Sequence, residues 1–411
     1  MSLFHNSKQK LKNIQRTIDG LLDGDFPLSS GQNALNKLKV VFSDLELKLN
    51  RAHNLSDHAA ERQLSSFVSL KIYQTLPILG FILRSTNVRN AFELLDPFQT
   101  ISDSILNGNP QILLSSEWDY VPFAYPQSLE DLRNFILIGL PASEAASALL
   151  VPLAGHELGH AVWRNRQVGN GVHAALQNRC EQLYKEKIDT FKKHFPDYDP
   201  NDIIYMEIFP EAIAKSVGFA NFQAEELFCD MFAYGIFGES YLYAFSYILA
   251  PGTTRSPGSK YPSYKTRITT LVDIAALEGI TLPDAASLNF ADETPRGLPR
   301  ERFIIQMAET AVTEIKSALW KNVSDIISSG KVCRPSMNLS EKHLNDFNLG
   351  VPAHDPQCLG DILNAGWMFY RNIQQLESAP DNLSERLDRL NEMILKTIEV
   401  LEYIRRSDNG P

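Results

Sequence analysis

The stretch Gly155-His156-Glu157-Leu158-Gly159-His160 decides how the rest of the chain is interpreted, because it spells the pattern H-E-x-x-H. Four residues along an α-helix turn by roughly 400° and rise by about 6 Å. His156 and His160 are therefore expected on one helix face, where both imidazoles can reach a single metal ion. Glu157 lies beside them and can reach a water molecule in an open coordination position. The stretch thus predicts a zinc site on a helix.

A catalytic zinc ion usually has three protein ligands, so two histidines require a third. One known spacing puts a third His six residues after the second, but this chain has Arg166 there. His173 is the next histidine, and its place in a polar segment beyond two glycines makes it a weak alternative.

A carboxylate pair fits the third position better. The segment Glu226-Leu227-Phe228-Cys229-Asp230 lies in an aromatic, sparsely charged stretch, where carboxylates are costly unless they are paired. Glu226 is expected to bind the metal. Asp230, one turn later, is expected to accept the free N–H of a ligating His. Glu225 is the alternative ligand, but only Glu226 has the four-residue spacing to Asp230.

Together, His156-Glu157-x-x-His160 and Glu226-x-x-x-Asp230 resemble the gluzincin metallopeptidases. The second motif is similar to the Glu-x-x-Ala-Asp of the group that includes the CAAX-processing protease and the heat-shock protease HtpX. That group often carries His-Pro followed by Arg-Ile, and this chain has Tyr261-Pro262 followed by Arg267-Ile268. The resemblance covers residues 140–275 and implies a zinc-dependent endopeptidase.

The resemblance also implies a mechanism. One zinc ion per chain is held by His156, His160 and Glu226. Glu157 is the general base, which takes a proton as water attacks a peptide carbonyl and delivers it to the leaving amine.

The oxyanion formed by that attack needs a hydrogen-bond donor besides the metal. Tyr261 is the expected catalytic donor, at the position where the group often has His. Tyr264 is an alternative donor, and Arg267 is a candidate for a buried anchor near them.

The pattern of apolar residues predicts an α+β fold that is mostly α, with a zincin-like core containing a small sheet. Apolar runs at 111–115 and 135–139 predict strands, and the proline-containing run 120–126 predicts an edge strand. The expected regions are a helical N-terminal region (1–110), the metallopeptidase core (111–280), a linker (281–300) and a helical C-terminal region (301–411).

Composition limits the partners and the compartment. A net charge of −10 and a pI near 5.5 argue against nucleic acid as a partner. Four widely spread cysteines and an N-terminus without an apolar signal region predict a cytoplasmic protein. The apolar stretches Phe67–Leu83 and Asn134–Gly155 are short or interrupted for a membrane span, so both are expected in the core.

The expected substrate is a protein or peptide. The helical regions on both sides of the core suggest a regulatory protein partner or a homodimer formed through the helical termini. Two alternatives stay open: a zincin-like binding or regulatory protein without proteolysis, and a membrane-associated processing peptidase.

Overall fold

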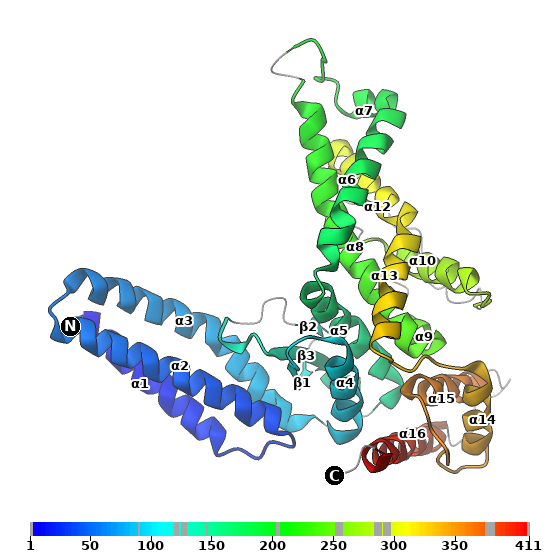
Figure 1. Cartoon of the computed structure of the whole chain (residues 1–411), viewed down its shortest axis with the longest axis horizontal. Helices are drawn as coiled ribbons and strands as arrows, with labels where there is room; N and C mark the ends of the chain where they lie inside the picture. Colours follow the sequence, from blue (N-terminus) through cyan, green and yellow to red (C-terminus); the bar gives the residue numbers. More distant parts are fainter. Residues whose placement is uncertain are drawn as a thin grey trace. The chain divides into compact units, whose positions relative to one another are not determined.

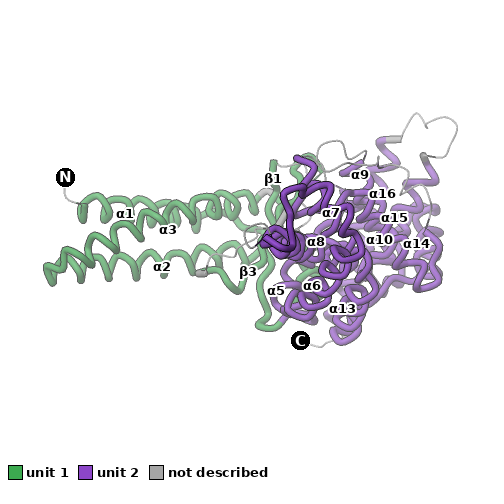
Figure 2. Tube along the Cα trace, turned by 90° about the horizontal axis from the view of Figure 1, so that it is seen from above, with its two compact units in different colours: residues 1–103, 107–146 green, residues 104–106, 147–411 purple. Residues whose placement is uncertain are grey.

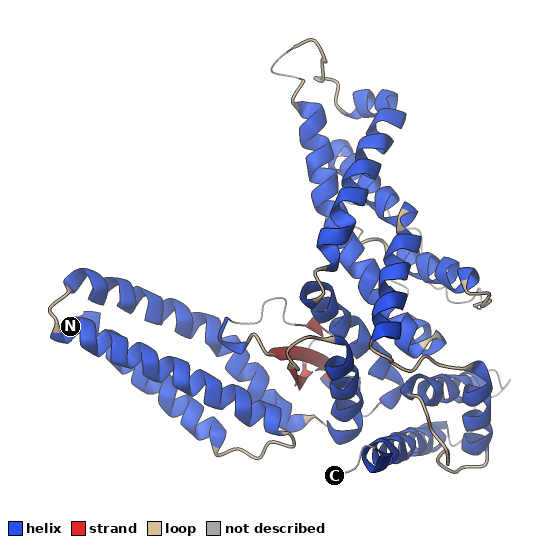
Figure 3. Cartoon of the chain, viewed as in Figure 1, coloured by secondary structure: helices blue, strands red, loops and turns tan. Residues whose placement is uncertain are grey.

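The computed structural model describes residues 3–88, 91–118, 123–124, 130–144, 147–202, 206–250, 258–282, 290, 297–374 and 383–408. The chain is mostly helical with one small sheet, which confirms the α+β, mostly α prediction (Figures 1 and 3). The helices are α1 (Leu3–Leu22), α2 (Ser29–Asn54), α3 (His58–Arg84), α4 (Ala91–Ile105), α5 (Val151–Asn165), α6 (Val168–Glu186), α7 (Ile188–His194), α8 (Ile208–Phe237), α9 (Glu239–Leu249), α10 (Tyr264–Leu277), α12 (Pro299–Glu314), α13 (Lys316–Ser329), α14 (Met337–Asn348), α15 (Leu359–Gln374) and α16 (Leu383–Asp408). The short 3-10 helices are η1 (Ser85–Asn87), η2 (Glu130–Leu132), η3 (Ala142–Glu144) and η4 (Ala148–Leu150).

The sheet has the strand order β1-β3-β2. β1 (Gln111–Glu117) runs parallel to β3 (Phe135–Pro141), with Gln111 opposite Phe135. β2 (Phe123–Ala124) is a short antiparallel edge strand on β3. Both expected strands and the edge position of the third are therefore confirmed; the rest of the run 120–126 lies outside the described residues.

The chain divides into two compact units, residues 1–103 with 107–146 and residues 104–106 with 147–411 (Figure 2). This division differs from the regions expected from the sequence. The sheet groups with the N-terminal helices instead of with the H-E-x-x-H helix. Residues 301–411 group with that helix instead of forming a separate region, and most of the expected linker, 281–300, lies outside the described residues.

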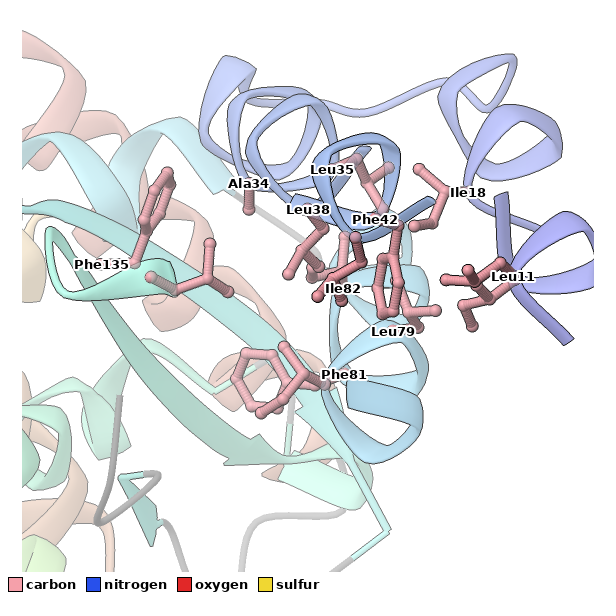
Figure 4. Close-up of a cluster of buried hydrophobic side chains, with 14 of the residues drawn as sticks. Leu11, Ile18, Ala34, Leu35, Leu38, Phe42, Leu79, Phe81, Ile82 and Phe135 are labelled. Carbon is pink, nitrogen blue, oxygen red and sulfur yellow. The ribbon is translucent and has the colours of Figure 1, made fainter. Parts of the chain in front are cut away.

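The first unit is built around an antiparallel bundle of α1, α2 and α3. Apolar side chains of the three helices and of the sheet form one buried cluster (Figure 4). It includes Leu11, Ile18, Leu35, Leu38, Phe42, Leu79, Phe81, Ile82 and Phe135. Side chains three and four positions apart point to one helix face, and their spacing explains why each helix contributes a continuous apolar stripe.

Helix α3 has a proline, Pro77, in its interior. The helix runs through Pro77 to Arg84. Proline lacks the N–H that would bond to the carbonyl of Tyr73, and Tyr73 is exposed, so water can satisfy that carbonyl. The prediction that Phe67–Leu83 is buried core is wrong for the outer face of the helix, where several apolar side chains are exposed.

The second unit is organised around α8, which contacts α5, α6, α9, α10, α12, α13 and α15. The aromatic stretch 222–249 forms about half of α8 and all of α9. The two helices are separated by Gly238, whose φ of +61° lies in the left-handed region that glycine adopts without steric cost. This break turns α9 back so that it can contact α5 as well as α8.

Candidate metal centre

The candidate site lies where α5 crosses α8. Pro152 occupies the first turn of α5, where proline is favoured because its missing N–H has no partner in the helix. The two glycines of the motif allow a close crossing. A Cβ atom on Gly155 would lie 2.5 Å from the ring of Phe237, and one on Gly159 would lie 2.9 Å from the Cα atom of Cys229. Only a helix without these Cβ atoms can approach α8 so closely.

The crossing brings both histidines of the motif to one carboxylate. The Nε2 atom of His156 lies 3.4 Å from one oxygen of Glu226, and that of His160 lies 3.7 Å from the other. A tetrahedral ion with ligand bonds of about 2.1 Å holds its ligand atoms roughly 3.4 Å apart. The two separations to Glu226 are therefore close to those between the ligand atoms of a tetrahedral ion.

The other nitrogen of each ring is also held by a carboxylate. His156 donates from Nδ1 to Asp230 at 2.9 Å, and His160 donates from Nδ1 to Glu225 at 2.9 Å. These bonds fix both ring orientations and direct the Nε2 atoms toward Glu226. Asp230 lies where the sequence placed it. Glu225, considered as an alternative ligand, instead orients His160.

Asp230 is fully buried and accepts hydrogen bonds from three other helices. Arg267 of α10 donates from Nε to one oxygen at 2.7 Å and from Nη2 to the other at 2.6 Å. Tyr241 of α9 donates its hydroxyl to Asp230 at 2.5 Å, and His156 of α5 is the third partner. The expected anchor, Arg267, thus supports the orientation of a candidate metal ligand through Asp230.

The charges of this cluster depend on one another. Burial alone would raise the pKa of Asp230, but the charge and hydrogen bonds of Arg267, with those of His156, hold that pKa well below its usual range. Burial alone would lower the pKa of His156, but Asp230 and Glu226 outweigh it and raise that pKa to about 10. Two carboxylates facing one imidazole favour a positive charge there, which a proton or a metal ion can carry.

Cys229 lies at the same crossing. Its sulfur and one nitrogen from each of His156 and His160 lie within 4.8 Å of one another. Burial first, and then the nearby carboxylates of Glu226 and Glu225, raise the pKa of the thiol well above its ordinary value. A bound metal ion can displace the proton of a coordinating thiol, so Cys229 is an alternative third ligand to Glu226.

Glu157 lies in α5 directly after His156, and its side chain is buried. Within the described part of the chain, its carboxylate has no hydrogen-bond or ion-pair partner. Its oxygens are not among the fully enclosed atoms without a partner, so solvent can reach this carboxylate, as a general base requires.

The two tyrosines expected as oxyanion donors have different surroundings. Tyr264 is buried, and its ring packs against Phe245 and Phe290. Tyr261 is 40% exposed on the segment that precedes α10. Its carbonyl accepts from the N–H of Gly258 at 3.2 Å, so Tyr261 belongs to a turn next to α8.

That turn is tied to α8 through Gln223. The side-chain amide of Gln223, one turn before Glu226, donates to the carbonyl of Gly258 at 3.1 Å. Neither this contact nor the one between Tyr241 and Asp230 was predicted from the sequence. Tyr241 is one of many aromatic residues in a buried stretch, and its partner becomes visible only when α9 turns back at Gly238.

His173, the weak alternative ligand, contacts Asn221 and is exposed at that contact. Among the described residues, His156, His160 and Cys229 form the one group of three His, Cys, Asp or Glu side chains whose ligand atoms all lie within 4.8 Å of one another. No protein-family model matches the chain, and no curated protein and no solved structure matches it either.

Proposed function

We propose that this chain is a zinc-dependent endopeptidase of the gluzincin type, with a zincin-like core and one zinc ion held by His156, His160 and Glu226. The observation that supports this most is the approach of both Nε2 atoms to the two oxygens of Glu226, at 3.4 and 3.7 Å. Carboxylates on both Nδ1 atoms leave only the Nε2 atoms to face the ion.

When bound, zinc supplies Lewis-acid chemistry, which activates water and polarises a peptide carbonyl. Glu157 takes the proton from the attacking water and gives it to the nitrogen of the leaving amine. Its lack of a partner within the described residues keeps the carboxylate available for both transfers. Tyr261, whose side chain is partly exposed, is the proposed hydrogen-bond donor to the oxyanion.

The substrate class follows from this chemistry: a protein or peptide that can place a backbone carbonyl between Glu157 and the metal. The helical regions outside residues 140–275 favour a selective enzyme over a digestive one, because they offer surfaces for a protein partner or a second copy. The cytoplasm is the proposed compartment, since four widely spaced free cysteines suit a reducing environment.

The test compares the parent with Glu157→Gln and Glu226→Ala. Each purified chain is assayed for zinc by elemental mass spectrometry and for cleavage of a peptide mixture of random sequence. Glu157→Gln should keep zinc and lose cleavage by about a hundredfold or more, because it removes the base and no ligand. Glu226→Ala should lose both. An active Glu157→Gln chain would refute the assigned mechanism.

A second candidate function is a closed metal site in a binding or regulatory protein without proteolysis. It is favoured by one observation, the Cys229 sulfur within 4.8 Å of a nitrogen of both histidines. Zinc with four protein ligands is structural and has no open position. Cobalt substitution separates the two: a thiolate-to-cobalt charge-transfer band that Cys229→Ser removes would establish the closed site. An unchanged spectrum in Cys229→Ser would support the open one.

A further inference from the structure

The outer face of α3 presents a row of apolar side chains to solvent. Phe67, Leu70, Tyr73, Leu76 and Leu83 are between 47% and 81% exposed. Scattered exposed leucines are ordinary, but large contiguous apolar patches on a soluble surface mark interaction sites. These five residues follow the exposed side of α3 over about 24 Å, at 1.5 Å per residue. We call this row the α3 apolar face.

The α3 apolar face contains no carboxylate. Between Arg62 and Arg84 the helix has a single charged residue, Lys71, and that residue is buried and forms an ion pair with Asp131. By length and composition α3 could cross a membrane, with a mean hydropathy of 1.4 in its most apolar window. However, its inner face is packed in the bundle, and Lys71 is fixed there by its partner, so only the outer face is offered.

The three-helix bundle α1–α3 differs in the sign of its charge from the chain as a whole. Residues 1–84 contain eleven Lys and Arg and seven Asp and Glu, a net charge of +4, in a chain of net charge −10. Two of these cations border the α3 apolar face. Arg62 begins the row, and Lys10 of α1 donates to Ser69 of α3 at 3.1 Å, beside Leu70. A positive, apolar surface is complementary to anionic lipid.

We propose that the α3 apolar face docks on the surface of an anionic membrane, with α3 lying in the plane of the interface. The face offers apolar side chains, one strongly exposed tyrosine and flanking cations. Tyrosine is enriched at the boundary between lipid and water, where its ring is buried and its hydroxyl stays hydrated.

A membrane suits this face better than a second copy of the chain does. A homodimer formed through α3 would bring two bundles of net charge +4 together, which opposes association, whereas an anionic surface attracts one bundle. This inference does not depend on the proposed peptidase activity.

The test uses the full chain in vesicle co-sedimentation. One set of vesicles contains equal parts of phosphatidylglycerol and phosphatidylcholine, and the other contains phosphatidylcholine alone. The parent should sediment with the anionic vesicles and much less with the neutral ones, and added salt should release it. The double variant Leu70→Glu with Leu76→Glu should bind at least about tenfold more weakly, since it removes apolar contact and adds repelled charge.

The matched control is Val40→Glu with Leu47→Glu on α2, where the side chains are 68% and 69% exposed. It adds the same charge to the same bundle at another helix, so it should retain most of the binding. Equal loss in both variants, equal binding to both vesicle types, or no binding of the parent would overturn the proposal. So would a fall in thermal stability or the loss of a dimer in the α3 variant without vesicles, because either would show that protein covers the face.

Discussion

The closest contact between the two metal-bearing helices gives the sharpest prediction, at Gly159. A methyl group added there would meet the Cα atom of Cys229 at 2.9 Å, and its Cβ and Sγ atoms at 3.1 Å. Carbon atoms in contact are ordinarily about 3.5 Å or more apart, so α8 would have to move away by several tenths of an ångström. Since the obstacle includes backbone, a change of rotamer cannot relieve it.

The energy follows from two opposing effects. Alanine in place of glycine stabilises a helix by about 1 kcal/mol, and overpacking of a filled core costs about 1–3 kcal/mol. Gly218 of α8 provides the control, because it is exposed and a Cβ atom there would meet nothing within 4 Å. Gly159→Ala should therefore be about 1–3 kcal/mol less stable than Gly218→Ala, which has the helix gain without the clash.

The same displacement acts on the candidate metal site. Cys229 lies between Glu226 and Asp230, so moving it away from α5 lengthens the separations of 3.4 and 3.7 Å that suit a zinc ion. Zinc affinity should fall by about tenfold to a hundredfold, the effect usual for disturbed surroundings of metal ligands.

Two assays check both effects. Urea unfolding of the metal-free chains can be followed by tryptophan fluorescence, to which Trp163 contributes from its contact with Phe228 across this helix pair. Zinc affinity is measured by competition with a chromophoric chelator. If Gly159→Ala matched Gly218→Ala in stability and the parent in zinc affinity, the close crossing would have no role in building the site.

Three further predictions concern the carboxylates of the site. Glu226→Gln should abolish zinc binding at stoichiometric concentration, whereas Glu225→Gln, which affects only the orientation of one imidazole, should weaken it by about tenfold to a hundredfold; equal effects in a chelator titration would contradict the ligand assignment. Arg267→Met leaves Asp230 buried without its main cation and should lower the unfolding free energy by about 3–5 kcal/mol, measured in urea; a loss below about 1 kcal/mol would show that the carboxylate is neutral without it. Tyr241→Phe removes one of several donors to Asp230 and should cost about 1–2 kcal/mol while zinc binding persists, so complete loss of zinc would refute its supporting role.

The sequence predicted which side chains converge where α5 crosses α8, because the signals for them are local. His156 and His160 are four residues apart on a helix, and Glu226 and Asp230 repeat that spacing in a second helix. A helix has a fixed geometry, so the spacing alone places each pair on one face. Carboxylates in an apolar stretch are costly unless they have partners, and this predicted that Glu226 and Asp230 contact the two histidines.

What the sequence did not reveal depends on tertiary contacts. Tyr241 reaches Asp230 only because Gly238 turns the chain between α8 and α9, and no local pattern encodes that direction. Glu225 and Glu226 are adjacent, and their two roles differ because each faces a different nitrogen of His160. Both the buried and the exposed side of α3 carry leucine and phenylalanine or similar apolar residue types. Composition alone therefore could not show which side faces the core.

Asp230 joins α5, α8, α9 and α10 through one side chain, and this has a consequence for how the chain can change over evolutionary time. His156, Tyr241 and Arg267 all donate to the carboxylate of Asp230, so substitutions of these three residues will not have independent effects on stability. A change at Arg267 that is harmful in this background could be neutral in one where Asp230 is already replaced. The order in which mutations arise then matters. Descendants of this chain should keep or lose the network as a set, with few intermediate forms.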